Sequence, residues 1–108
     1  MNIKTVALAL SMLAATGPAM ANCYETIGCD DSDYFSRSDL RQFSCQALWE
    51  VRNAIYDQNG FCFQTERAAR FFGNAGCWVD DQGQVRLNAY ERENVATIRS
   101  VERSKGCN

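Results

Sequence analysis

The fold is decided by the stretch Trp49-Glu50-Val51-Arg52-Asn53-Ala54-Ile55-Tyr56-Asp57-Gln58-Asn59-Gly60-Phe61-Cys62-Phe63. With the residues just before it, this stretch predicts one amphipathic helix, because its packing positions recur at three- and four-residue steps. Ser44 precedes the helix, where its hydroxyl can accept a hydrogen bond from a first-turn N–H. Asn59-Gly60 ends the pattern, and Phe61 is then placed to pack back on Tyr56. The predicted packing positions are Cys45, Leu48, Val51, Arg52, Ile55 and Tyr56.

Two further helices are expected downstream. Thr65 is a suitable N-cap for a helix that stops at the glycine-containing segment 73–76 and packs through Ala68, Ala69, Phe71 and Phe72. Asn88 is followed three residues later by Glu91, which is close to a capping box and predicts a last helix that runs to about Ser104. Its apolar positions are Leu87, Tyr90, Val95, Ile98 and Val101.

Shorter elements are expected around these helices. Ser38 can cap a turn of helix over residues 39–42. The turn sequence of residues 80–83 allows a short hairpin between Trp78-Val79 and Val85-Arg86-Leu87. The predicted fold is therefore mainly α, a small three-helix disulfide-stapled domain to which a short β-hairpin can be added.

The N-terminus has the form of a secretory signal peptide. Lys4 gives it a positive start, residues 5–15 are mostly apolar, and Ala19-Met20-Ala21 has the small-x-small form that signal peptidase accepts. The apolar run is far shorter than the ~20 residues of a membrane span. Asn22 directly before Cys23 argues against lipidation. We expect cleavage after Ala21, a periplasmic or secreted location and no transmembrane segment after cleavage.

All six cysteines follow this cleavage site, in a chain without histidine and without a Cys-x-x-Cys motif. The pattern predicts disulfides, and we expect neither a metal nor a cofactor. If the first and last helices are antiparallel, Cys45 lies beside Cys107. Cys62 and Cys77 flank the middle helix, and Cys23–Cys29 completes the set. Six cysteines allow 15 connectivities, so this pairing is a hypothesis from geometry.

The acidic residues near the N-terminus and the net charge exclude several classes of function. Asp30, Asp31 and Asp33 lack the glycine and the distal glutamate of a calcium loop, so we interpret them as a solvated acidic turn in an irregular arm. Loss of Lys4 from 11 basic residues leaves 10 against 13 acidic ones, a net charge of −3. This charge argues against nucleic-acid binding and against a polybasic membrane contact.

No catalytic constellation is evident. Without histidine there is no imidazole base, and paired thiols cannot serve as nucleophiles. Acidic residues on helices are usually solvated or paired at i,i+4, the spacing of Glu66 and Arg70. We therefore expect a protein that is not an enzyme and has no catalytic residues. The carboxylates that remain formal candidates are Glu66, Asp80, Asp81, Glu91, Glu93 and Glu102.

Four residues are candidates for ligand contact: Arg52, Trp49, Trp78 and Tyr56. Arg52 can have a structural role, in which it pairs with a carboxylate such as Glu102 or bonds to helix-end carbonyls, or it can grip a ligand carboxylate with its planar fork. The structural role is the favoured interpretation, since a long Arg stem readily packs on a core. In a helix Arg52 and Asn53 diverge by about 100°, so we expect them to face different ways. The tryptophans can be core residues or anchors, and with Tyr34, Phe35 and Tyr90 they could form a platform for a sugar or peptide.

Several motifs, in this order, resemble the bacterial YARHG domain, a small extracellular domain. They are Arg52-Asn53-Ala54-Ile55-Tyr56, Gly60-Phe61-Cys62-Phe63, Phe71-Phe72, Trp78, Leu87-Asn88, Asn94, Ile98 and Glu102. The five residues that name the domain read Tyr56-Asp57-Gln58-Asn59-Gly60 here, so only the first and last match and the histidine is absent. The resemblance covers roughly residues 39–107. It implies a secreted or envelope location and carries over no catalytic or binding residue.

These observations divide the chain into a signal peptide (1–21), an N-terminal arm (22–38) and a YARHG-like domain (39–108). We expect an exported, non-catalytic binding or interaction module of the bacterial cell envelope, with peptidoglycan or another envelope component as its partner. The alternative is a secreted protein that inhibits another exported protein such as a hydrolase.

Overall fold

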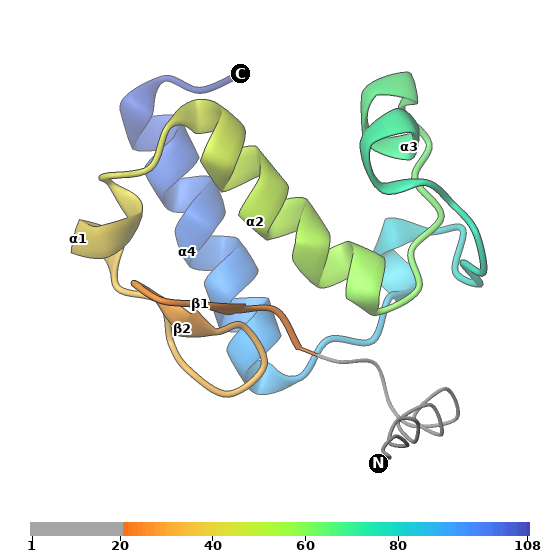
Figure 1. The fold of residues 1–108 in the computed structure, drawn as a ribbon, viewed down its shortest axis with the longest axis horizontal. Helices are drawn as coiled ribbons and strands as arrows, with labels where there is room; N and C mark the ends of the chain where they lie inside the picture. Colours follow the sequence, from red (N-terminus) through yellow and green to blue (C-terminus); the bar gives the residue numbers. More distant parts are fainter. Residues whose placement is uncertain (1–20) are drawn as a thin grey trace, which may run out of the picture.

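The computed structural model describes residues 21–108, so residues 1–20 of the predicted signal peptide lie outside the described part. The chain forms β1 (Cys23–Tyr24), β2 (Gly28–Cys29), α1 (Arg37–Leu40), α2 (Cys45–Gln58), α3 (Glu66–Phe72), a 3₁₀ helix η2 (Gln82–Gln84) and α4 (Ala89–Lys105) (Figure 1). The fold is mainly α with a short two-stranded antiparallel hairpin, which confirms the predicted class. No helix formed by residues 21–108 has both the length and the apolar character that a membrane span requires.

The antiparallel pair of α2 and α4 forms the centre of the molecule (Figure 1). The Ser44 hydroxyl accepts a hydrogen bond from Ala47 N, and Asn88 with Glu91 forms a complete capping box, so both helices start where the sequence predicts. Apolar side chains of the two facing stripes are fully buried between them: Leu48, Ile55, Ile98 and Val101. The two periodic segments therefore enclose one core, as their spacing predicts.

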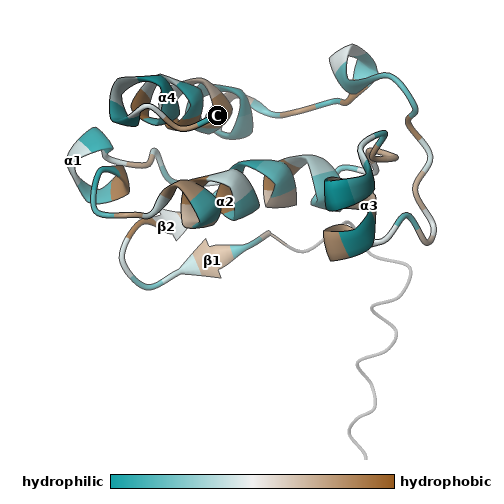
Figure 2. Cartoon of the chain, turned by 90° about the horizontal axis from the view of Figure 1, so that it is seen from above, coloured by the Kyte–Doolittle hydropathy of each residue, from teal (hydrophilic) through white to brown (hydrophobic). Residues whose placement is uncertain are grey.

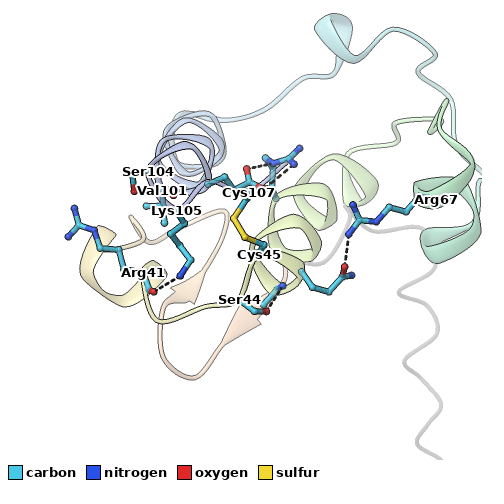
Figure 3. The surroundings of a disulfide bond; sticks show 12 residues. Arg41, Ser44, Cys45, Arg67, Val101, Ser104, Lys105 and Cys107 are labelled. Carbon is cyan, nitrogen blue, oxygen red and sulfur yellow. Dashed lines mark hydrogen bonds and ion pairs between the residues drawn. A yellow bond between two sulfur atoms is a disulfide. The ribbon is translucent and has the colours of Figure 1, made fainter.

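All three predicted disulfides are present. Cys45–Cys107 joins the start of α2 to the chain just beyond α4, with Cα atoms 5.5 Å apart (Figure 3). Cys62–Cys77 closes the base of α3, and Cys23–Cys29 joins the two strands of the hairpin. No cysteine within residues 21–108 is free. Antiparallel packing of α2 on α4 is the geometry that made this pairing predictable.

Three local predictions are wrong. α1 begins at Arg37 because Ser36, not Ser38, is its N-cap and accepts a hydrogen bond from Asp39 N. The segment 78–87 forms no hairpin: Asp81 accepts a hydrogen bond from Gly83 N and starts η2, while Val79 makes a parallel bridge to Phe61. The hairpin instead lies in the N-terminal arm, which was expected to be irregular.

The arm packs into the same core as the helices. Ile27 and Phe35 are buried, and in Figure 2 α4, α2 and the hairpin follow one another from top to bottom. Asn94 on α4 is fully buried and accepts a hydrogen bond from Phe35 N while its amide donates to the backbone carbonyls of Asp30 and Asp33. Asp30 is itself fully buried, so its interpretation as part of a solvated turn is wrong. The reason is that α4 supplies hydrogen bonds that fold this turn inward.

Candidate binding cleft

A cleft of about 680 Å³ opens between α2, α3, α4 and the segment that leads into η2. Its lining includes side chains of α2, Arg99 of α4, and Asp80, Asp81 and Gln82. Phe61 and Phe63, which are only 7% and 5% exposed, contribute apolar surface. The cleft therefore combines an apolar lining with polar groups of both charges, as ligand sites in proteins commonly do.

Arg52 lines this cleft but is already paired. Its Nε and one terminal nitrogen donate to the two Glu102 oxygens over 2.8 and 3.1 Å, and both side chains are largely buried at 15% and 12% exposure. This is the structural role that the sequence favoured for Arg52. The two-bond geometry of guanidinium on carboxylate fixes α2 against α4 and leaves Arg52 little freedom to bind a second carboxylate.

Arg99 is the cation of the cleft that forms no ion pair among residues 21–108. No carboxylate within residues 21–108 approaches Arg99 closely enough to form an ion pair, although Asp80 and Asp81 line the same cleft. A guanidinium that is half-buried and lacks a counter-charge attracts a ligand carboxylate more strongly than one already neutralised. Sequence analysis missed Arg99. The available signal was its position directly after the buried Ile98 and three residues before Glu102.

Asn53 adds a hydrogen-bond acceptor. It is 6% exposed, and its amide nitrogen donates to the Trp49 carbonyl one turn earlier. Its Oδ1 accepts no hydrogen bond from the described residues, yet no fully buried polar side-chain atom among them is unpaired. Oδ1 therefore reaches solvent, through the cleft that Asn53 lines. Arg52 and Asn53 have different partners, Glu102 of α4 and the Trp49 carbonyl of α2, but both line the cleft.

Trp49 is the aromatic wall of the cleft and is held on several sides. Phe71 and Phe72 lie 5.6 and 5.8 Å from its ring by centroid distance, and the Arg67 guanidinium lies 3.8 Å above it. Phe72 in turn stacks on Phe63, with centroids 5.0 Å apart. α3 is thus attached to α2 mainly through aromatic contacts. Trp49 is held in place by these contacts and keeps a partly exposed edge at the cleft.

The wall that follows α2 is braced by hydrogen bonds. Asn74 accepts from Phe63 N over 2.9 Å and donates to Phe63 O over 3.0 Å, so it pairs with an otherwise unpartnered stretch of backbone. Cys62 N donates to Val79 O over 2.8 Å. Together with Cys62–Cys77 these bonds fix the chain on both sides of Phe63. The apolar lining of the cleft is preformed, which lowers the ordering cost of binding.

The remaining candidate contacts lie elsewhere. Tyr56 is 8% exposed and packs on Phe61, 6.0 Å away by ring centroid, so it belongs to the core. Trp78 is 70% exposed and does not line the cleft. Tyr34 packs against Tyr90, with ring centroids 4.5 Å apart, and neither residue lines the cleft, so the structure does not gather the aromatic residues into one platform. Of the four candidates, only Trp49 and Arg52 share the cleft.

No group of three or more His, Cys, Asp or Glu side chains within residues 21–108 is arranged to hold a metal ion. Comparison with curated proteins and with solved structures gave no match. Comparison with protein-family models matched the YARHG domain over residues 24–103, which is most of the chain and includes α2, α3, η2 and nearly all of α4. The match begins in the N-terminal arm, fifteen residues ahead of the region on which the resemblance was seen. The chain belongs to the YARHG domain family.

Proposed function

We propose that the protein is exported, that signal peptidase cleaves it after Ala21, and that the mature domain is a non-catalytic binding module of the bacterial cell envelope. Membership in an extracellular domain family and three disulfides support export. The observation that carries the binding proposal is the cleft in which Arg99, Asn53 and Trp49 offer a cation, an acceptor and an aromatic wall.

The chemistry of the cleft favours a short peptide that bears both a carboxylate and an amine. Arg99 is positioned for the carboxylate, Asp80 for the amine, and Asn53 Oδ1 for an amide N–H. The stem peptides of peptidoglycan carry these groups on small apolar side chains, which suit a lining of Phe61 and Phe63. We therefore propose peptidoglycan as the ligand, bound through its stem peptide.

Sedimentation with purified sacculi tests this proposal. The mature protein should co-sediment, and Arg99→Gln should weaken binding about tenfold, because loss of one charge-assisted contact costs about 1.4 kcal/mol or more. Arg103→Gln is the matched control: it removes the same charge from the same helix at an exposed position outside the cleft. Wild-type protein that stays in the supernatant would defeat the proposal. Equal binding by the two variants would show that the cleft is not the site.

Exposure of Trp78 favours the alternative, an inhibitor of another exported protein. Its indole ring is 70% exposed but rests against Gly60, beside Cys62–Cys77. A large, immobilised aromatic on the surface is the kind of residue that anchors protein–protein contacts. An inhibitor would co-purify from periplasmic extract with one partner at a fixed ratio. Trp78→Ser should abolish that complex while Arg99→Gln leaves it intact.

A further inference from the structure

Two buried carboxylates share one hydrogen-bond donor at the end of α2. Gln58 Nε2 donates to Asp30 Oδ1 over 2.9 Å and to Glu91 Oε2 over 3.1 Å. Asp30 is fully buried and Glu91 is 5% exposed. Glu91 also receives bonds from Asn88 N and from the Asn59 amide, so its charge is well solvated by fixed dipoles. The site nevertheless places two acidic groups together in the interior.

The described residues supply no cation to this pair of acids. Within residues 21–108 the ion pairs are Arg52–Glu102 and Glu66–Arg70, and neither involves Asp30 or Glu91. A buried charge without a counter-charge is costly to fold. Burial raises the pKa of Asp30, hydrogen bonds from Gln58 and Asn22 lower it, and the charge of Glu91 raises it further. Burial, with a smaller contribution from the Asp30 carboxylate, also raises the pKa of the nearby Tyr24 to about 12.

The residue that faces Asp30 from the other side is Asn22. Its backbone nitrogen lies 3.3 Å from Asp30 Oδ1, and its side-chain amide donates to Asp30 Oδ2 over 3.1 Å. The same amide donates to the Gln58 side chain and to the Ala54 carbonyl, and Asp30 N donates to Asn22 O over 2.9 Å. The side-chain amide contacts and the Asp30 N–Asn22 O bond therefore hold the backbone nitrogen of Asn22 against a buried carboxylate.

We propose that the mature N-terminus is the missing counter-charge: cleavage after Ala21 turns the Asn22 amide nitrogen into an ammonium group that forms an ion pair with Asp30. Hydrolysis adds water across the Ala21–Asn22 peptide bond, leaving a carboxylate on Ala21 and, at neutral pH, an ammonium on Asn22. The inference rests on the cleavage position given under the proposed function. No atom has to move far, because the nitrogen already lies at hydrogen-bond distance in the uncleaved chain.

This arrangement couples processing to stability. The uncleaved chain folds around a carboxylate that has only neutral donors, whereas the cleaved chain gains a charge-assisted hydrogen bond in a water-poor site. The α-amino group should therefore have a pKa above its ordinary value of about 7.7–8.0, since the neighbouring carboxylate stabilises its charged form. Because the pKa of the α-amino group is higher in the folded than in the unfolded protein, the ion pair stabilises the fold fully at a pH below the unfolded-state pKa. This stabilisation is lost as the pH rises through the folded-state pKa.

The pKa of the α-amino group is the direct measurement. Mature protein that begins at Asn22 is titrated by NMR, with the Asn22 ¹³Cβ shift as the readout. A pKa above 8.0 is expected, and a pKa no higher than 7.7–8.0 would overturn the ion pair. If Asp30 is the partner of the α-amino group, Asp30→Asn should lower the pKa of that group and Asp31→Asn should not. Asp31→Asn is the matched control because it removes the same charge from the adjacent position. The Asp31 side chain makes no hydrogen bond among the described residues; only its backbone carbonyl does.

A second measurement does not require Asp30→Asn to fold. A Gly-Ser-Ala extension placed before Asn22 keeps a terminal charge but moves it three residues away. The extended protein should melt several degrees lower than the mature protein at pH 6, and the difference should shrink as the pH rises above 9. Equal melting temperatures at pH 6 would overturn the proposal. Sequencing the N-terminus of exported protein tests the cleavage site separately, so an N-terminus other than Asn22 would count against the cleavage step and not against the contact itself.

Discussion

α4 and α3 are attached to α2 in different ways. α4 contributes five buried residues, Glu91, Asn94, Val95, Ile98 and Val101, and it is joined to α2 by a disulfide and by the buried Arg52–Glu102 pair. α3 buries only Ala68 completely and is held by aromatic contacts to Trp49, by Asn74 and by a local disulfide.

This difference in packing indicates where the fold leaves space for a ligand. Fully buried apolar side chains fill the centre of the α2–α4 interface, and the hollow that Arg52, Arg99 and Glu102 line at its edge has a volume of only about 160 Å³. α3 stands off from the pair, and the cleft lies in the gap that its seven residues are too few to fill. A disulfide and fixed aromatic contacts keep that gap from closing. Ligand binding is thus expected at the less tightly packed junction between α2 and α3, whereas the stability of the fold comes mainly from the interface between α2 and α4.

Removal of a disulfide is expected to have the largest effect on the two junctions. Replacing Cys45 and Cys107 with serine releases a loop of 62 residues and should lower the free energy of unfolding by about 4 kcal/mol, whereas replacing Cys62 and Cys77 releases 15 residues and should cost about 3 kcal/mol. Urea denaturation measures both. The first variant should keep sacculus binding while it remains folded. The second should lose binding because its cleft wall is released. The reverse pattern would contradict the division of roles.

The two Arg–Glu pairs give a sharper contrast. Arg52→Met keeps the apolar stem but leaves Glu102 buried without its partner, which should cost about 2–3 kcal/mol. Arg70→Met removes a pair whose side chains are 75% and 83% exposed, so its cost should stay below about 0.5 kcal/mol. Urea denaturation of both variants and of the wild-type protein measures the two changes in the free energy of unfolding. If the two variants were equally stable, the Arg52–Glu102 pair would not join α2 to α4 as described.

Sequence predicted the features that depend on neighbours along the chain. Ser44, Thr65 and Asn88 cap helices in the structure because a cap acts within three residues. Periodicity located the first and last helices, and the assumption that they pack antiparallel then predicted the pairing of Cys45 with Cys107. The contact of Phe61 with Tyr56 follows from the same local rule.

Other features made by residues far apart in sequence were not predicted. Asp30 looks like a surface residue until Asn94, 64 positions later, donates to its carbonyl and Gln58 donates to its side chain. Arg99 becomes a cleft residue only because α3 and the segment before η2 lie beside α4. The hairpin expected over residues 78–87 fails because Asp81 bonds locally to Gly83 and because Val79 pairs with Phe61. Each case depends on a partner that no local rule identifies.

Gly60 tests how the α3 side of the molecule is held to the end of α2. Its φ of 88° is unfavourable for any other L-residue, by about 1–2 kcal/mol, and a Cβ there would overlap the indole of Trp78. Gly73 has a comparable φ of 74°, but nothing lies within 4 Å of the Cβ it would gain. Gly60→Ala should therefore cost more than Gly73→Ala, and the excess is the cost of displacing the Trp78 indole from the end of α2. Thermal denaturation with near-UV circular dichroism follows both the stability and the tryptophan environment. If both variants lost the same free energy of unfolding, the Trp78 indole would move aside without cost. Its contact with Gly60 would then not brace the end of α2.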